Sequence, residues 1–340
     1  MVIMQLSRII TMYLAMSSQK TLNHMRALYE TTHVSGGGTA DFKATRDIYY
    51  KPIVPELQEQ LNCDGYVHIP AAVPKLIVDF FRKEFADIFK CKQTSEYVDQ
   101  HKGIGSLFDM LEFPWAVGLA VDPWLLGLRN RLGFVDAKFT YGIVFIKAPH
   151  TPRTFWHQDG TVWNTDLAYE DPAPEILQAF YLDGSNENYG ALRVLPGTHR
   201  RRHELHTILA NTPKPDLRSA KDPTSPAFAT QEGEVTIATE PGDMVLMDAR
   251  LLHSTHANTT ALNRTTVTLS YLSSKALADE RVLARYTPEK AEANTRVPYI
   301  PEGFLPPDLR SAFASVLPPP YLGEKSPLPY CNTPRWVTQA

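Results

Sequence analysis

The sequence predicts a mainly β protein with flanking helices and a jelly-roll core. Up to about residue 132 the apolar residues recur at helical spacing, whereas from about 136 to 275 the chain consists of short β-branched and aromatic segments separated by turns. Short strands in succession, with helices outside them, are typical of an antiparallel jelly-roll sandwich. We therefore expect the core at about 136–275.

The helices are expected first along the chain. Apolar residues between Pro74 and Lys90 form one stripe of a helix, and residues 114–132 are expected to be helical with a break at Asp122-Pro123. The later segments are rich in residues that favour strands. The expected strands are Lys138–Lys147, Ile176–Leu182, Ala191–Leu195, Glu234–Ala238, Met244–Met247 and Thr265–Leu272.

Two stretches fit neither pattern. Residues 207–232 are rich in Pro, Ser, Thr and Asp, and we expect them to form a long loop near the mouth of a site. Residues 297–340 are rich in proline and are expected to wrap the surface, with covering the site or joining a dimer as alternatives. We expect an N-terminal extension at 1–45, flexible or targeting, and a single domain at 46–340.

The composition indicates an intracellular protein. The net charge of −3 gives no general attraction to nucleic acid, and three widely spaced cysteines do not form a disulfide framework. No apolar run is long enough for a membrane span. We expect a cytoplasmic monomer or homodimer. The first 29 residues carry basic but no acidic side chains, so organellar targeting is an alternative, beside a packed helix or an upstream start codon.

The segment His157-Gln158-Asp159 contains two side chains that bind metal ions. It follows the expected strand at 138–147 after a short loop, and the end of a strand can hold a ligand rigidly. A His-x-Asp pair alone is a short motif with a high risk of chance occurrence. The motif therefore indicates a metal site only if other parts of the chain supply further ligands.

A second segment supplies a third ligand and a cation. The turn Pro241-Gly242-Asp243 leads into an apolar strand, then to His253, and Arg264 opens the next strand. A strand, a loop and a returning strand place His253 and Arg264 near each other on the inner face of a sheet. Two imidazoles and one carboxylate are the set for non-heme iron(II) with three open positions. The guanidinium fork binds a carboxylate, so a 2-oxo acid is expected beside the metal, with O2.

Four blocks in register resemble a known family. They are Asp64–Pro70, His157–Asp159, Gly190–His199, and the set Gly242, Asp243, His253, Asn258 and Arg264. Over roughly residues 60 to 275 the chain resembles the phytanoyl-CoA dioxygenase family of iron(II)/2-oxoglutarate oxygenases. The resemblance implies the double-stranded β-helix form of the jelly roll, and Fe(II), 2-oxoglutarate and O2 as cofactor and co-substrates.

The resemblance also implies roles for individual residues. His157, Asp159 and His253 correspond to the iron ligands, Arg264 to the residue that pairs with the distal carboxylate of 2-oxoglutarate, and Thr255 to a hydroxyl that reaches the same carboxylate. The carboxylate at 159 argues against halogenation, since related halogenases have a small residue there.

Other positions leave alternatives open. His256 is a rival third ligand, but its distance along the chain to Arg264 does not fit the family. Asn258 matches the motif, with a possible role only in shaping the loop. In His199–His206 the histidines suggest a second metal site, although no carboxylate or cysteine completes it and a solvated basic face is the simpler interpretation.

The predicted activity is oxidation of an unactivated C–H bond of a small molecule, in specialised or amino-acid-like metabolite biosynthesis. Hydroxylation is the default outcome, with desaturation or oxidative cyclisation as alternatives. Trp163 and Asn164, which flank the iron motif, and Lys147 are expected substrate contacts, with core packing as the rival interpretation for the aromatic residue. The competing functions are an oxygenase acting on a macromolecule and a non-catalytic metal- or ligand-binding jelly roll.

Overall fold

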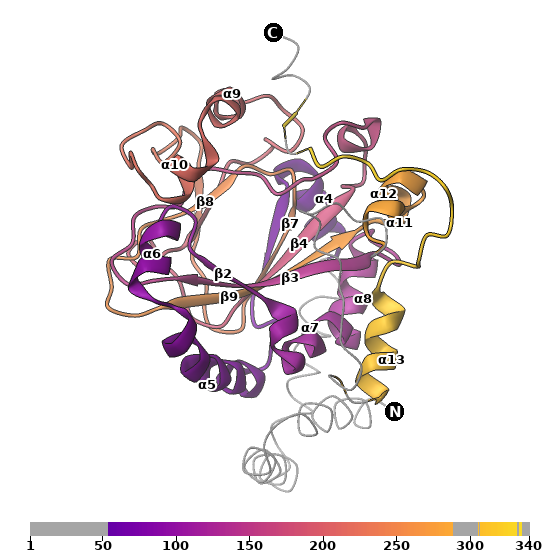
Figure 1. Ribbon diagram of the computed structural model, residues 1–340, viewed down its shortest axis with the longest axis horizontal. Helices are drawn as coiled ribbons and strands as arrows, with labels where there is room; N and C mark the ends of the chain where they lie inside the picture. The colour runs from indigo at the N-terminus through magenta and orange to yellow at the C-terminus, as the bar shows by residue number, and fades with distance from the viewer. Residues whose placement is uncertain (1–53, 288–304, 306, 332, 335–340) are drawn as a thin grey trace, which may run out of the picture.

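The computed structural model describes residues 54–287, 305, 307–331 and 333–334. Within them the core consists of two antiparallel sheets, as the jelly-roll prediction requires, with helices packed around the larger one (Figure 1). The extension expected at 1–45, and the first part of the stretch expected at 297–340, lie outside the described residues. Among the described residues, no helix combines the length and the apolar character needed to cross a membrane.

The two sheets differ in size. The large sheet has the strand order β1-β7-β4-β9-β3-β2 and the small sheet has the order β6-β5-β8, with every neighbouring pair antiparallel. The strands are β1 (Tyr66–Ile69), β2 (Ser106–Asp109), β3 (Lys138–Lys147), β4 (Glu175–Tyr181), β5 (Leu192–Val194), β6 (Val235–Ile237), β7 (Met244–Asp248), β8 (His253–Thr255) and β9 (Arg264–Leu272).

Strand β4 shows how the alternation of side chains produces two cores. Ile176 and Phe180 belong to the core that the large sheet shares with the helices. Leu177, Ala179 and Tyr181 point the other way and pack with residues of the small sheet. The space between the two sheets is therefore lined by the second set, and it is here that the site lies.

Helices cover the outer face of the large sheet. Apolar residues of α5, α7, α8 and α13 share one core with that face, and Figure 1 shows these helices on the same side of it. The helical region is broken at Asp122, between α7 and α8. Its Oδ1 caps the start of α8 by accepting hydrogen bonds from the amides of Trp124 and Leu125. The helices are α4 (Val54–Asp64), α5 (Lys75–Lys92), α6 (Ser95–His101), α7 (Gly118–Val121), α8 (Pro123–Arg131), α9 (Glu204–Asn211), α10 (Lys214–Arg218), α11 (Ser274–Leu277), α12 (Glu280–Arg285) and α13 (Pro307–Val316).

Most of the expected elements are present. The strand Lys138–Lys147 has the expected bounds, and the other five agree to within about one residue at each end. The short strands β1, β2 and β8 were not predicted. The long loop expected at 207–232 is wrong in part, since it contains the end of α9 and all of α10.

The C-terminal segment runs back over the molecule after α13. Its backbone joins the segment that follows the His157-Gln158-Asp159 motif: the amide of Cys331 donates to the carbonyl of Thr161 at 3.3 Å, and Val162 and Cys331 form a parallel bridge. The described part of this segment therefore both wraps the surface and reaches the site.

Candidate metal centre

Backbone pairing brings the two sequence-distant histidines together. The amide of His157 donates to the carbonyl of His253 at 2.9 Å, and the amide of His253 donates back to the carbonyl of His157 at 2.8 Å. This antiparallel bridge sets the two imidazole rings 4.2 Å apart between centroids. The position of both rings is therefore fixed by the main chain and not only by side-chain packing.

The carboxylate of Asp159 completes the cluster. The amides of Asp159 and Gly160 both donate to the carbonyl of Ala249, at 2.8 and 2.7 Å, which holds the turn after the motif against the second segment. Asp159 Oδ2 lies 3.6 Å from His253 Nε2. One ligand atom from each of His157, Asp159 and His253 lies within 4.8 Å of the others, so the three can hold one metal ion. We refer to these three residues as the ligand cluster.

Hydrogen bonds set the tautomer of both imidazoles. Nδ1 of His157 lies 2.9 Å from the carbonyl of Phe155, and Nδ1 of His253 lies 3.0 Å from the carbonyl of Leu251. A carbonyl only accepts, so each Nδ1 carries the proton and each Nε2 keeps its lone pair for a metal. Burial also lowers the pKa of His253 to about 4, which keeps this imidazole neutral. The donor set fits iron(II).

A cavity of about 120 Å³ extends from the ligand cluster into the space between the two sheets. We call it the inner pocket. Its walls are inward-facing residues of β3, β4, β5, β7, β8 and β9, with Thr255 and Arg264 among them. Thr255 Oγ1 lies 3.2 Å from Thr154 Oγ1 in this wall. The structure thus brings Thr255, Arg264 and the ligand cluster to one cavity.

Arg264 is a buried cation with no anion beside it among the described residues. Only 2% of the residue is exposed, its Nη1 donates to Thr266 Oγ1 at 3.3 Å, and neither Nε nor Nη2 has a hydrogen-bond partner among the described residues. The nearby carboxylate of Asp183 is occupied by Arg82, at 2.9 Å, and by the amide of Thr265. Burial lowers the pKa of Arg264. A carboxylate brought by a ligand fits these two free donors.

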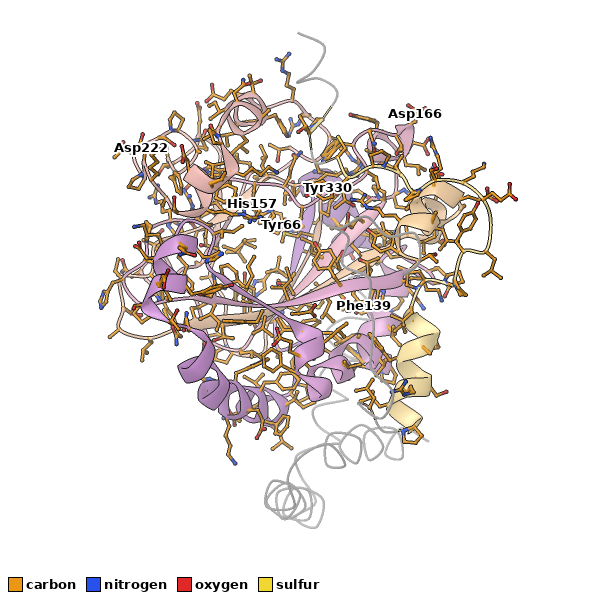
Figure 2. The ribbon with its side chains drawn as sticks, viewed as in Figure 1. Tyr66, Phe139, His157, Asp166, Asp222 and Tyr330 are labelled. Atoms are coloured by element: carbon orange, nitrogen blue, oxygen red, sulfur yellow. The ribbon has the colours of Figure 1, made fainter. Side chains whose placement is uncertain are left out.

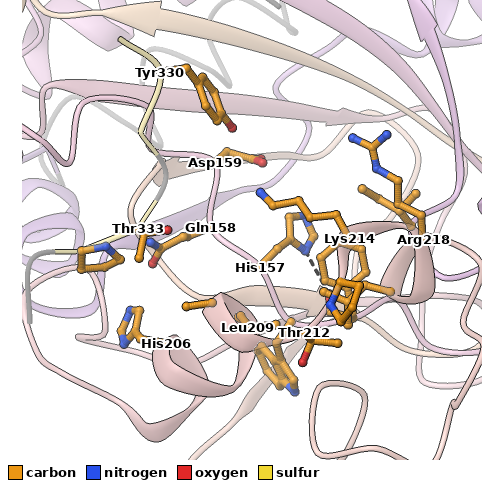
Figure 3. A pocket seen from close by; sticks show the side chains of 17 residues that line it. His157, Gln158, Asp159, His206, Leu209, Thr212, Lys214, Arg218, Tyr330 and Thr333 are labelled. Atoms are coloured by element: carbon orange, nitrogen blue, oxygen red, sulfur yellow. Dashed lines mark hydrogen bonds between the residues drawn. The ribbon is translucent and has the colours of Figure 1, made fainter. Parts of the chain in front are cut away.

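A larger cavity of about 380 Å³ lies on the outer side of the ligand cluster (Figure 3). We call it the outer pocket. It shares His157 and Asp159 with the inner pocket, and its walls come from Phe155 and Trp156, from the segment of α9 and α10, and from the C-terminal segment. Figure 2 shows His157 and Tyr330 near each other at this end of the molecule, away from the helix-covered core around Phe139.

The three residues expected to contact substrate line neither pocket. Trp163 is buried in a small core with Val162 and Leu272. Asn164 is exposed and donates from Nδ2 to the carbonyl of Pro329 at 3.1 Å. Lys147 is fully buried and donates from Nζ to the carbonyl of Pro152 at 2.5 Å. Their proposed contacts with substrate gain no support from this geometry.

The structure also shows where the residues with alternative interpretations lie. His256 turns away from the ligand cluster, and its Nε2 lies 2.8 Å from Thr236 Oγ1. The Asn258 amide nitrogen donates to three carbonyls, of Lys147, Ala148 and Leu262, and so shapes the loop. His203 and His206 form a capping box at the start of α9, which accounts for their spacing without a metal.

Sequence reasoning missed residues of the outer pocket. Lys214, Arg218 and Tyr330 all line it. The first two stand in a segment expected to be an irregular loop, and Tyr330 lies far from both motifs along the chain. No motif or periodicity marks any of them, and only the composition of 207–232 suggested a position near the site mouth.

Comparison with known proteins identifies a family. The sequence model of phytanoyl-CoA dioxygenase matches residues 61–266, which is more than half of the chain. No curated protein sequence gives a significant match.

Several solved structures are similar at low identity. The carbocyclase SnoK of nogalamycin biosynthesis is 20% identical over 64% of this chain and 83% of its own, with a TM-score of 0.47. HygX from Streptomyces hygroscopicus, crystallised with nickel and 2-oxoglutarate, is 16% identical over 64% and 86%, with a TM-score of 0.48. EctD from S. alaskensis, with bound iron, is 18% identical over 64% and 76%, with a TM-score of 0.47. Identities and TM-scores this low do not show what this chain binds.

Proposed function

The chain belongs to the phytanoyl-CoA dioxygenase family, and on that premise we propose that it oxidises an unactivated C–H bond of a small molecule. As a member it is a 2-oxoglutarate-dependent non-heme iron oxygenase that uses Fe(II), 2-oxoglutarate and O2. Hydroxylation is the proposed default, and desaturation or oxidative cyclisation are the variants. The proposed biological setting is the biosynthesis of a specialised or amino-acid-like metabolite.

We assign the metal to the ligand cluster. His157 and His253 each offer a lone pair on Nε2, held in place by the carbonyls that accept from Nδ1, and Asp159 offers a carboxylate oxygen. When bound, iron and 2-oxoglutarate together supply the oxidant for the C–H bond.

We assign the far carboxylate of 2-oxoglutarate to Arg264 and Thr255. Both line the inner pocket, and the two free donors of Arg264 can bind a carboxylate through the guanidinium fork. The rings of Phe145 and Tyr181 lie 4.8 and 5.8 Å from the guanidinium carbon and keep water from it. An anion in this place satisfies a charge that is otherwise buried alone.

The outer pocket supports a small molecule over a macromolecule as substrate. Its volume of about 380 Å³ lies within the range of small-molecule sites, and it opens beside the ligand cluster. Its walls come from separate segments of the chain, which bound a cavity of limited size beside the ligand cluster. The protein's part in catalysis is then to hold the target carbon beside the metal position.

One observation carries this proposal: a buried arginine, with no anion beside it in the described part of the chain, faces the cavity that the ligand cluster opens into. The test is an anaerobic titration of Fe(II) and 2-oxoglutarate into metal-free protein, following the weak visible charge-transfer band of the iron chelate. We expect a band in the wild type, none in His157→Ala and a weakened one in Arg264→Ala. Absence of a band from folded wild-type protein would refute the site assignment and favour a non-catalytic domain.

The reaction is tested separately from the site. Once the band is established, candidate small molecules are screened for stimulated release of succinate under O2. Product analysis by mass then distinguishes a gain of oxygen from a loss of two hydrogens. Stimulation by a protein or nucleic acid, and by no small molecule, would overturn the proposed substrate class.

A further inference from the structure

Two cations face the outer pocket from one helix. Lys214 is the first and Arg218 the last residue of α10, and both line the cavity. In Figure 3 the Lys214 side chain extends toward Asp159, with Arg218 beside it. Both residues are exposed at the rim of the pocket, so a ligand that enters from solvent meets them before it reaches the ligand cluster.

Neither cation is balanced within the described structure. Lys214 and Arg218 have no ion pair or side-chain hydrogen bond with a described residue, and the acid of the same helix, Asp216, pairs with Lys221 instead at 3.4 Å. Among the described residues that line the outer pocket, Asp159 is the one acidic side chain, and it belongs to the ligand cluster. A metal ion there balances the charge of Asp159 and leaves both cations of α10 without an anion.

The spacing of the two cations has an energetic consequence. Residues four apart on a helix are neighbours on its surface, and like charges in these positions repel. Burial, and then the charge of Arg218, lower the pKa of Lys214. An anion placed between the two side chains relieves this repulsion.

The remaining walls of the outer pocket are mostly apolar or aromatic. Phe155 and Trp156 form one wall, Leu209 and Leu217 come from the α9 and α10 segment, and Tyr330 comes from the C-terminal segment. A ligand that matches this cavity has an apolar or aromatic body and a negative charge at one end.

We propose that the substrate carries an anionic group, a carboxylate, sulfate or phosphate, which Lys214 and Arg218 bind while its apolar body lies against Phe155 and Leu209. This inference rests on the proposed function, because it takes the outer pocket as the substrate site. The anion acts as an anchor. Since α10 and the ligand cluster line the same cavity, the anchor limits which carbon of the substrate reaches the metal position.

Two dyes that differ in one group test the anion site. They are 1-anilinonaphthalene-8-sulfonate and N-phenyl-1-naphthylamine, which has the same ring system without the sulfonate. Both are titrated by fluorescence into protein with Fe(II) and 2-oxoglutarate under argon. The test variant is Lys214→Gln/Arg218→Gln. The matched control is Lys221→Gln, which removes a charge from the same segment but outside the pocket.

We expect the wild type to bind the sulfonate dye more tightly than the neutral dye. Partly exposed ion pairs contribute modestly, so the double variant should bind the sulfonate dye roughly threefold to tenfold more weakly and the neutral dye unchanged. Lys221→Gln should change neither. Equal losses for both dyes, no loss for the sulfonate dye, or the same loss in Lys221→Gln would each overturn the anion site.

The two proposals fail in different ways. The charge-transfer band of Fe(II) and 2-oxoglutarate is recorded for each protein before the dye is added. A band in all variants without a preference for the sulfonate dye overturns the anion site alone. No band in the wild type overturns the proposed function, and the dye titrations, which need no turnover, then report on the anion site by themselves.

Discussion

The inner and outer pockets share His157 and Asp159 but are built differently. The inner pocket is lined largely by side chains of paired strands from both sheets, whose positions are set by ladders of backbone hydrogen bonds. The outer pocket is lined by two short helices, the loop between them and the end of the chain. The inner pocket is therefore the rigid part of the site, suited to holding iron and 2-oxoglutarate. The outer pocket is the part whose residues can vary without disturbing the sheets.

The family match reaches the two pockets to different extents. It spans residues 61–266, so it covers the ligand cluster, Thr255 and Arg264 of the inner pocket and the α9 and α10 residues of the outer pocket, but not Tyr330, Thr333 or Pro334. Part of the outer pocket comes from a segment that the family match does not reach, and the choice of substrate is expected to depend on it.

The largest expected effect is the loss of a metal ligand. Removing a residue that only supports a ligand weakens metal binding roughly 10- to 100-fold, so His253→Ala should lose more than that and abolish turnover. The measurement is Fe(II) affinity by anaerobic titration, with succinate release as the second readout.

His256→Ala is the matched control for this experiment. It removes an imidazole three residues away that bonds to Thr236 outside the ligand cluster, and it should bind Fe(II) like the wild type. If instead His256→Ala lost the metal and His253→Ala kept it, the assignment of the third ligand would be wrong.

The next effect is on 2-oxoglutarate in the inner pocket. Hydrogen bonds to a charged group contribute about 1.5–3 kcal/mol, so Arg264→Gln should weaken 2-oxoglutarate binding roughly 10- to 150-fold. The affinity for Fe(II) itself should stay unchanged, because Arg264 does not belong to the ligand cluster. Arg264→Lys keeps the positive charge but loses the planar guanidinium group. Its affinity for 2-oxoglutarate should therefore lie between those of the wild type and Arg264→Gln. Equal affinity for 2-oxoglutarate in all three proteins would contradict this division of roles.

The sequence allowed the inner pocket to be predicted better than the outer one. Arg264 opens β9, His157 and Asp159 follow β3 after a loop, and His253 follows β7, and the composition of these three strands marks them clearly. Nothing comparable marks the outer pocket. Tyr330 reaches it only because Cys331 pairs with Val162, a contact between residues far apart in the chain.

The positions of Trp163, Asn164 and Lys147 outside both pockets have identifiable physical reasons. Trp163 and Asn164 were expected at the site because they follow the motif, but after the turn at Gly160 the chain leaves the cavity and joins a separate core. Lys147 pairs with Arg264 in the strand register, yet its amine bends toward the carbonyl of Pro152. Closeness in sequence, or even in register, does not give the direction of a side chain.

A third prediction concerns the pH dependence of stability that a buried carboxyl group in the large sheet causes. Glu175 of β4 is fully buried and accepts from Thr161 Oγ1 at 2.9 Å and Ser270 Oγ at 2.8 Å, so it ties the segment after Asp159 to the large sheet. Burial raises its pKa to about 7. The folded protein thus holds a proton that the unfolded chain releases near the ordinary pKa of a glutamate, 4.5. Stability from this group is full below that value and falls as the pH rises through about 7.

Glu175→Gln removes the titrating group and keeps the shape. Between about pH 5.5 and pH 8.5 the wild type should lose on the order of 2 kcal/mol of unfolding free energy that the variant does not lose. Urea unfolding at both pH values, followed by tryptophan fluorescence, measures the difference, and other titrating groups cancel between the two proteins. Parallel pH dependence would show that Glu175 is ionised throughout and that the hydrogen bonds overcome its burial.

The smallest effect is expected at the wall of the outer pocket that lies beyond the family match. The Tyr330 ring is 46% exposed, so Tyr330→Ala should weaken binding of N-phenyl-1-naphthylamine by only roughly threefold to tenfold, from the loss of part of one aromatic contact. Binding of Fe(II) and 2-oxoglutarate should not change, because the ring lines only the outer pocket. Leu322→Ala, a change at a 92% exposed side chain of the same C-terminal segment, controls for general loosening of that segment. A fall in 2-oxoglutarate affinity in Tyr330→Ala would mean that the two pockets are coupled, and the division drawn between them would then have to be given up.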